Sequence, residues 1–168
     1  MRKITYLLLA LSFLFAACEG PQGPPGFDGF DGQDGGLIVA SAFEIVIDFN
    51  EANNFEFIEA YGFEVFPSDV TLVYILWDSI DGQDIWRLMP QNVIYDDGSI
   101  LTYNFDFTQE DVRFFLDGSA DPLALDDVWT QNQVFRVVVV PADNVDGVDT
   151  SNLNLIMELS DIQAFQIR

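Results

Sequence analysis

Short segments in which apolar and polar residues alternate constrain the fold of this chain more than any other feature. The apolar positions of the two clearest segments are Phe43, Ile45, Ile47 and Phe49 in the first and Leu101, Tyr103, Phe105 and Phe107 in the second. Successive side chains of a β-strand point to opposite faces, so each segment is predicted to be a strand with one buried face. A largely antiparallel β fold follows from this pattern.

Two further segments, 70–77 and 134–140, are apolar at every position except Thr71 and Arg136 and are rich in β-branched residues. They are predicted to be central strands that are covered on both faces. Segment 85–89 should pair with the first of them, because the Asp81-Gly82 dipeptide between them favours a tight hairpin turn. Asp97-Gly98 predicts a second such turn, just before the strand that begins near position 100.

The remaining segments are less strand-like. Segment 121–130 lacks a strand pattern, and 150–159 is predicted to be a short helix with a Ser or Thr N-cap and with Leu155, Ile156 and Leu159 on one face. Segment 162–167 is a candidate last strand. The predicted fold is therefore mainly β, an antiparallel β-sandwich of about seven or eight strands with one or two short helices. An immunoglobulin-like topology is one arrangement that this pattern allows.

The charge of the chain is strongly one-sided. Residues 19–168 hold all 28 acidic residues and only four arginines, a net charge of −24, and they contain no lysine. Proteins that bind nucleic acid neutralise phosphates with Lys and Arg along the contact surface. Nucleic acid is therefore excluded as a partner.

The N-terminus is typical of an export signal. Arg2 and Lys3 precede an apolar segment that is too short to span a membrane, which takes about 20 residues. It ends in Leu14-Phe15-Ala16-Ala17-Cys18, which resembles the lipobox of bacterial lipoproteins, although that motif usually has Leu where Phe15 stands. The resemblance implies that residues 1–17 are a signal peptide and that Cys18 accepts the lipid. An ordinary secretory signal with an incidental cysteine is the alternative.

Five consecutive Gly-X-Y triplets occupy residues 20–34. This repeat is that of collagen, in which only glycine fits at the axis of the triple helix. Five triplets are few, and the aspartates of the last three would stack without lysine partners in a trimer. We therefore predict an extended tether over residues 18–36, about 55 Å long at about 3.1 Å per residue, with trimerisation as the alternative.

The pattern Cys-Glu-Gly-Pro-Gln-Gly-Pro-Pro-Gly at residues 18–26 resembles the small collagen-like lipoproteins of Bacteroidota. The resemblance covers about the first 35 residues, and the acidic domain at 37–168 looks similar to the globular part of that group. It implies attachment to the outer membrane by lipid and display at the cell surface. It implies no established biochemical activity.

The chain lacks the residues of most enzyme active sites. It contains no histidine, and its single cysteine is the predicted lipid acceptor. Catalytic triads, Cys–His pairs and histidine-based zinc sites are thereby excluded. No nucleotide-binding motif is present, and a pair of carboxylates among 28 acidic residues carries no information about glycoside hydrolysis. We expect no enzymatic activity and no cofactor.

The motif Asp-x-x-Asp-Gly-x-Asp occurs twice, at residues 78–84 and 143–149. Closely spaced aspartates with a glycine can supply oxygen ligands to Ca²⁺, but this spacing does not match the EF-hand loop. We predict solvated turns, with weak calcium binding as the alternative.

Trp77, Trp86 and Trp129 lie in or beside predicted core segments, so we expect them to pack in the core or across strands. A platform that stacks sugar rings is the alternative. The function expected from the sequence is a non-enzymatic surface lipoprotein, a binding or accessory module for another envelope protein. A carbohydrate-binding lipoprotein is the second hypothesis.

Overall fold

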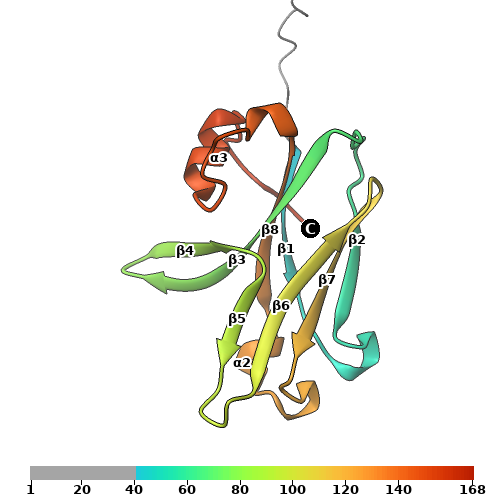
Figure 1. Cartoon of the computed structure of the whole chain (residues 1–168), viewed down its shortest axis with the longest axis vertical. Coiled ribbons are helices and arrows are strands. Elements are labelled where there is room, and N and C mark those ends of the chain that lie inside the picture. The colour runs from blue at the N-terminus through green and yellow to red at the C-terminus, as the bar shows by residue number, and fades with distance from the viewer. Residues whose placement is uncertain (1–40) are drawn as a thin grey trace, which may run out of the picture. The chain divides into compact units, whose positions relative to one another are not determined.

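The computed structural model describes residues 41–168, so the predicted signal peptide, Cys18 and the collagen-like tether lie outside the described residues. The described part is a mainly β fold of two sheets, as the sequence predicts (Figure 1). Its strands are β1 (Ser41–Ile47), β2 (Glu56–Ala60), β3 (Asp69–Ile80), β4 (Gln83–Leu88), β5 (Gln91–Ile94), β6 (Ile100–Phe107), β7 (Asp111–Gly118), β8 (Gln133–Pro141) and β9 (Gln166–Ile167).

Two α-helices and three 3-10 helices connect these strands. The α-helices are α2 (Asp127–Thr130) and α3 (Leu153–Leu159), and the 3-10 helices are η2 (Glu51–Asn53), η3 (Pro122–Ala124) and η4 (Ala142–Asn144). The strand count exceeds the expected seven or eight because β9, only two residues long, adds a short parallel pairing to β1.

The strand order is partly immunoglobulin-like. One sheet has the order β4-β3-β8-β1-β9 and the other β2-β7-β6-β5. A nine-stranded variable-type domain, numbered along its chain, has the orders 9-8-3-4-5 and 1-2-7-6. The two arrangements share the neighbours 8-3-4 and 2-7-6. They differ in β1 and β5, which have exchanged sheets, so β1 here lies beside β8.

The core lies between the two sheets. Phe43, Ile45, Ile47 and Phe49 are all at most 3% exposed, which confirms the alternation predicted for the first strand. In β6 the prediction holds for Leu101 and Tyr103, whereas Phe107 is 46% exposed because the end of the strand extends beyond the core. Aromatic rings from both sheets meet at Phe135, whose ring centroid is 4.9 Å from that of Phe114 and 6.2 Å from that of Phe49.

The central strands β3 and β8 are covered on both faces, as predicted from their largely apolar sequences. Their second face forms a separate buried cluster with α3, containing Leu72, Tyr74, Val138, Val140, Leu153 and Ile156. The hydroxyl of Tyr74 donates a hydrogen bond to the carbonyl oxygen of Thr150 at 2.6 Å, which fixes the loop before α3.

The details of α3 differ from the prediction. Its N-cap is Asn152, whose side-chain oxygen accepts a hydrogen bond from the backbone N–H of Leu155, rather than a Ser or Thr. The residues that it buries are Leu153 and Ile156, three positions apart, and Leu159 is 51% exposed. A helix this short covers the sheet with one turn, so its last turn extends past the buried surface.

Both predicted hairpin turns are present. Asp81 and Gly82 adopt φ angles of 53° and 79°, the left-handed values that a two-residue hairpin turn requires. Asp97 and Gly98 connect β5 to β6. A β-bulge between Leu76 and Asp78 interrupts the pairing of β3 with β4, and beyond it the hairpin projects sideways from the sandwich (Figure 1).

Gly118, the last residue of β7, should be the glycine least tolerant of substitution. It adopts a φ of 112°, and a Cβ atom there would collide with the backbone carbonyl of Ile100. Gly98 has a φ of 83° but no atom within 4 Å of its Cβ position. We expect Gly118→Ala to lower the free energy of unfolding by more than about 2 kcal/mol and Gly98→Ala by about 1 kcal/mol, since only the first adds a backbone clash to the strain. Urea unfolding of both variants tests this order, and equal effects would contradict it.

Two buried tyrosines should make the fold sensitive to alkali. Burial raises the pKa of Tyr74 and that of Tyr103 well above the usual value of 10.0, and Asp149 adds to the effect at Tyr74. Above pH 10 the unfolded chain releases these phenolic protons while the folded chain keeps them, so stability falls as pH rises. The expected slope is about 1.4 kcal/mol per pH unit for each tyrosine. Unfolding should therefore accompany the rise in tyrosinate absorbance, whereas ionisation of every tyrosine near pH 10 in an intact fold would contradict this account.

Candidate functional site

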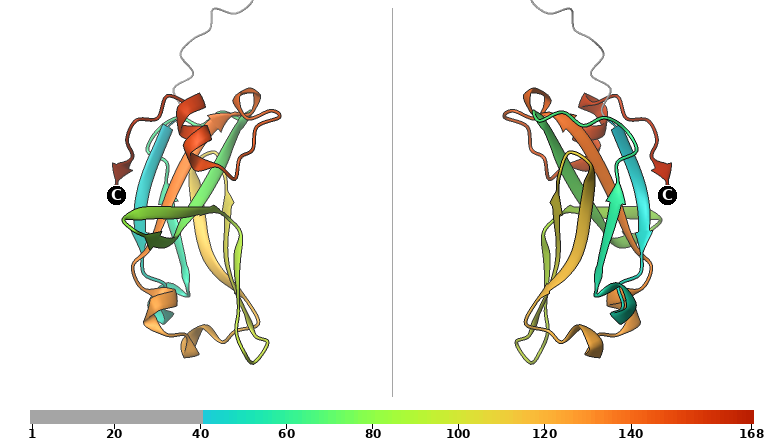
Figure 2. Two further views of the ribbon diagram at one scale, coloured as in Figure 1. Left: turned by 90° about the vertical axis from the view of Figure 1, so that its left-hand side faces the viewer. Right: turned by 90° about the vertical axis from the view of Figure 1, so that its right-hand side faces the viewer.

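Different secondary-structure elements lie at the two ends of the sandwich. β1 starts at Ser41 opposite Val139 and ends at Ile47 opposite Gln133, so the chain enters the sandwich at the end that also holds α3 (Figure 2). The opposite end is formed by residues 95–99 and 119–132, and we call it the distal end. It contains the β5–β6 turn, η3 and α2.

Hydrogen bonds hold the segments of the distal end together. The backbone N–H groups of Ser119 and Ala120 both donate to the carbonyl oxygen of Ile100, at 2.9 and 3.0 Å. The hydroxyl of Tyr103 donates to the carbonyl oxygen of Trp129 at 2.7 Å, and Phe49 N–H donates to the carbonyl oxygen of Thr130 at 2.7 Å. These bonds place α2 and the loop before it against the β5–β6 turn.

A cavity of about 640 Å³ opens between these segments. Its volume lies within the range of about 300–1,000 Å³ found for small-molecule sites. The side chains that can contact a ligand are two aromatic rings, four carboxylates and two hydroxyls, from Tyr95, Trp129, Asp96, Asp97, Asp121, Asp126, Ser99 and Ser119. We call this cavity the distal pocket.

The aromatic wall of the distal pocket is a pair of perpendicular rings. The ring centroids of Tyr95 and Trp129 are 6.0 Å apart with an interplanar angle of 89°. The hydroxyl oxygen of Tyr95 is buried and has no hydrogen-bond partner among residues 41–168. Its burial raises the pKa of Tyr95, and the nearby Asp126 raises it further. A buried hydroxyl without a partner is uncommon in native proteins.

Two of the four carboxylates are already used by the fold. Asp97 accepts hydrogen bonds from the backbone N–H and the hydroxyl of Ser99, at 2.8 and 2.6 Å, and these bonds lower its pKa. Asp121 caps η3 by accepting from the N–H of Leu123 at 3.1 Å. The side chains of Asp96 and Asp126 are exposed and make no hydrogen bond to any residue in 41–168, so their oxygens can bind a ligand.

No family model, curated protein or solved structure matches this chain. The distal pocket must therefore be interpreted from its own chemistry. Sequence reasoning singled out Trp129 as a packing residue and did not identify Tyr95, Asp96 or Asp126. They come from two segments more than 20 residues apart, and only the Asp97-Gly98 turn marks that region in the sequence.

The tryptophans pack as predicted. Trp77 and Trp129 lie partly buried against the main core, and Trp86 against the α3 cluster. The rings of Trp77 and Tyr103 are perpendicular, and arginine guanidinium groups lie over Trp77 and Trp86 at 4.2 and 4.0 Å. Because Trp86 packs against a different cluster from Trp77 and Trp129, the three indoles do not form one row.

The first aspartate repeat spans the β3–β4 hairpin, with Asp81 in the turn and Asp78 and Asp84 in the flanking strands, and the second runs from η4 into the loop that follows. The six carboxylates, at positions 78, 81, 84, 143, 146 and 149, are exposed. Asp149 accepts hydrogen bonds from the backbone N–H and the hydroxyl of Ser151, at 3.0 and 2.6 Å, and these bonds lower its pKa. Within residues 41–168, no three acidic side chains come close enough together to hold a metal ion.

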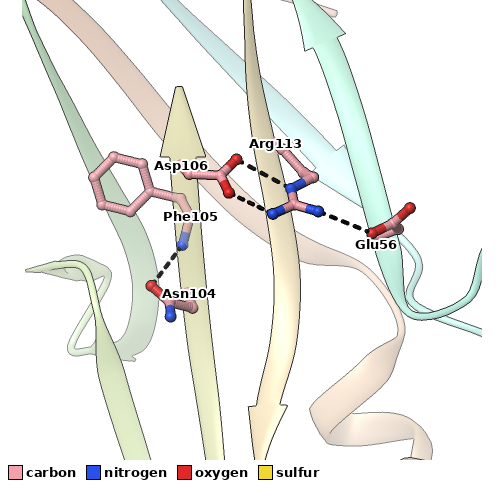
Figure 3. Close-up of polar contacts among 5 residues, drawn as sticks. All are labelled: Glu56, Asn104, Phe105, Asp106 and Arg113. Carbon is pink, nitrogen blue, oxygen red and sulfur yellow. Dashed lines mark hydrogen bonds and ion pairs between the residues drawn. The ribbon is translucent and has the colours of Figure 1, made fainter. Parts of the chain in front are cut away.

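A third polar cluster lies on the outer face of the second sheet (Figure 3). Arg113 of β7 binds both carboxylate oxygens of Asp106 on β6, and it reaches Glu56 on β2 at 3.5 Å. Next to it, the side chain of Asn104 accepts from the N–H of Phe105 at 2.9 Å. Because Arg113 is shared by carboxylates on both neighbouring strands, the cluster stabilises the strand order rather than offering a free group.

The described part of the chain contains no helix that is long and apolar enough to cross a membrane.

Proposed function

We propose that this chain is a non-enzymatic lipoprotein of the outer membrane, anchored through lipid on Cys18 and displayed at the cell surface. It acts as a binding or accessory module for another envelope protein, which contacts the distal end. The signal peptide at residues 1–17, the lipobox and the Gly-X-Y tether support the anchoring part of this proposal.

One observation carries the binding part. The tether precedes Ser41, where the chain enters the sandwich, and the distal pocket lies at the other end of the same strands. A ligand at the distal end therefore meets the part of the domain that is farthest from its attachment point. A tether of about 55 Å would hold this end clear of lipid head groups.

The chemistry of the chain favours binding over catalysis. The chain has no histidine, and its only thiol is the predicted lipid acceptor. The hydroxyl of Ser99 does donate to Asp97 in the pocket, but the lowered pKa of this carboxyl makes it a weak base for activating a nucleophile. The perpendicular rings and the guanidinium groups stacked on two indoles favour a protein partner over a polysaccharide.

Affinity purification of the full-length lipidated protein from solubilised membranes tests the proposal. An epitope placed in the exposed Asp81-Gly82 turn leaves both ends of the sandwich free. We expect one envelope protein to co-purify at close to equal stoichiometry, and not with an unrelated lipoprotein that carries the same epitope. Recovery of a bound oligosaccharide without a protein would support the carbohydrate hypothesis instead, and hydrolysis of an added polymer would contradict the non-enzymatic assignment.

A further inference from the structure

We infer that the distal pocket binds a basic side chain, arginine or lysine, presented by the partner protein. The inference rests on the proposed function, because it assumes that the ligand belongs to a protein. It goes further by naming the chemical group that the pocket recognises and the residues that recognise it.

The first argument is the volume of the open pocket and the residues that form its wall. The pocket is large enough for an extended side chain, and Trp129 and Tyr95 line it together with the apolar side chains of Ala120, Ala124 and Leu125. Arginine and lysine have long apolar stems that pack on such a wall while the cationic head interacts with ring faces and carboxylates.

The second argument is the charge balance around the pocket. Four carboxylates line it and no cationic residue does. The four arginines of the described part lie elsewhere: Arg113, Arg136 and Arg168 pair with carboxylates, and Arg87 stacks on Trp77. A basic side chain of the partner protein would therefore meet carboxylates that no arginine in residues 41–168 neutralises.

The third argument is the hydroxyl of Tyr95. Its oxygen is buried, lacks a partner, and lies at the aromatic wall. A buried acceptor without a partner indicates that a donor is missing among residues 41–168. A guanidinium or ammonium group supplies several N–H donors and one positive charge, which suits a pocket with an unpartnered hydroxyl and two exposed carboxylates, Asp96 and Asp126.

A neutral sugar fits the same pocket less well. Its hydroxyls could bind the carboxylates, but it would displace their water without compensating their charge. The perpendicular arrangement of the two rings also denies it a flat stacking surface. The high negative charge of the whole domain further increases the rate at which a basic partner is captured, an effect that salt reduces.

The test uses full-length lipidated protein in detergent micelles and two short peptides. One contains two arginines, and the other has citrulline, the neutral isostere, at the same positions. Calorimetry should show binding of the arginine peptide, weakened at higher salt, and at least tenfold weaker binding of the citrulline peptide. Equal binding of the two peptides, binding of neither, or displacement of the arginine peptide by a neutral oligosaccharide would overturn the inference.

Matched variants separate a specific site from diffuse attraction. The double variant Asp96→Asn/Asp126→Asn removes two exposed carboxylates from the pocket, and Asp84→Asn/Asp146→Asn removes two exposed carboxylates that lie outside it. We expect the first to weaken binding of the arginine peptide at least tenfold and the second by less than twofold. Equal losses would show that only net charge matters and would overturn the site. Tyr95→Phe should also weaken binding, without lowering the melting temperature.

Failure of the inference and failure of the proposed function are distinguishable. If the wild type captures an envelope protein and the Asp96→Asn/Asp126→Asn variant captures it equally well, the pocket assignment is wrong and the function stands. If the arginine peptide binds as described but no envelope protein is captured, the pocket chemistry stands and the proposed function is wrong.

Discussion

Replacing Cys18 with alanine is expected to abolish lipid attachment completely and to leave the full-length precursor uncleaved by the lipoprotein signal peptidase. The thiol is the only group at this position that can accept the diacylglyceryl chain, and the chain has no second cysteine to replace it. Each buried CH₂ of an acyl chain contributes about 0.8 kcal/mol, so losing two or three chains removes membrane attachment rather than weakening it. Incorporation of labelled fatty acid and the size of the protein on a gel measure both effects.

Ala16→Gly is the matched control for this experiment. It keeps a small residue two positions before Cys18, as the lipobox requires, and processing should continue. A Cys18→Ala protein that is still cleaved and still sediments with membranes would contradict lipid anchoring. It would favour the alternative that Cys18 is incidental in an ordinary secretory signal.

Phe135→Ala is expected to produce the largest loss of stability in the domain, about 3–5 kcal/mol. The side chain is fully buried in β8 and packs against the rings of Phe114 in β7 of the other sheet and of Phe49, which follows β1. Truncation leaves a cavity that β8 cannot move to fill, because hydrogen bonds to β1 and β3 hold it on both sides. The free energy of unfolding from urea titrations followed by tryptophan fluorescence measures the loss.

Phe66→Ala is the control, because it makes the same substitution at an exposed position. Phe66 is 54% exposed in the loop before β3, so removal of its ring should cost less than about 0.5 kcal/mol. A comparable loss in both variants would mean that the core does not lie between the two sheets where Phe135 stands. A loss confined to Phe135→Ala supports the packing described above.

The sequence predicts local features of the fold well. Alternation identifies the buried face of β1, and the Asp-Gly pairs identify the β3–β4 and β5–β6 turns, because both signals depend on residues that are close in the chain. The run at 134–140 in β8, apolar except at Arg136, likewise predicts a central strand, since a strand that is covered on both faces is apolar at nearly every position.

Long-range features are not predictable in the same way. A period of two tells which residues share a face but not which sheet a strand joins, so the place of β1 beside β8 could not be derived. The same limit applies to the distal pocket. Its two segments meet because Ser119 and Ala120 both bind the carbonyl of Ile100, a contact that requires the β6–β7 pairing first. Tyr95 and Asp126 carry no motif that would mark them in advance.

Site-specific photo-crosslinking in cells tests the central claim most directly, namely that the distal end contacts an envelope protein. A photoreactive phenylalanine derivative replaces Val128 in α2, which is 69% exposed at the distal end, or Leu159 in α3, which is 51% exposed at the end where the chain enters. The account predicts a crosslink to one envelope protein from position 128 and none from position 159. A crosslink from position 159 alone, or equal crosslinks from both positions, would contradict it.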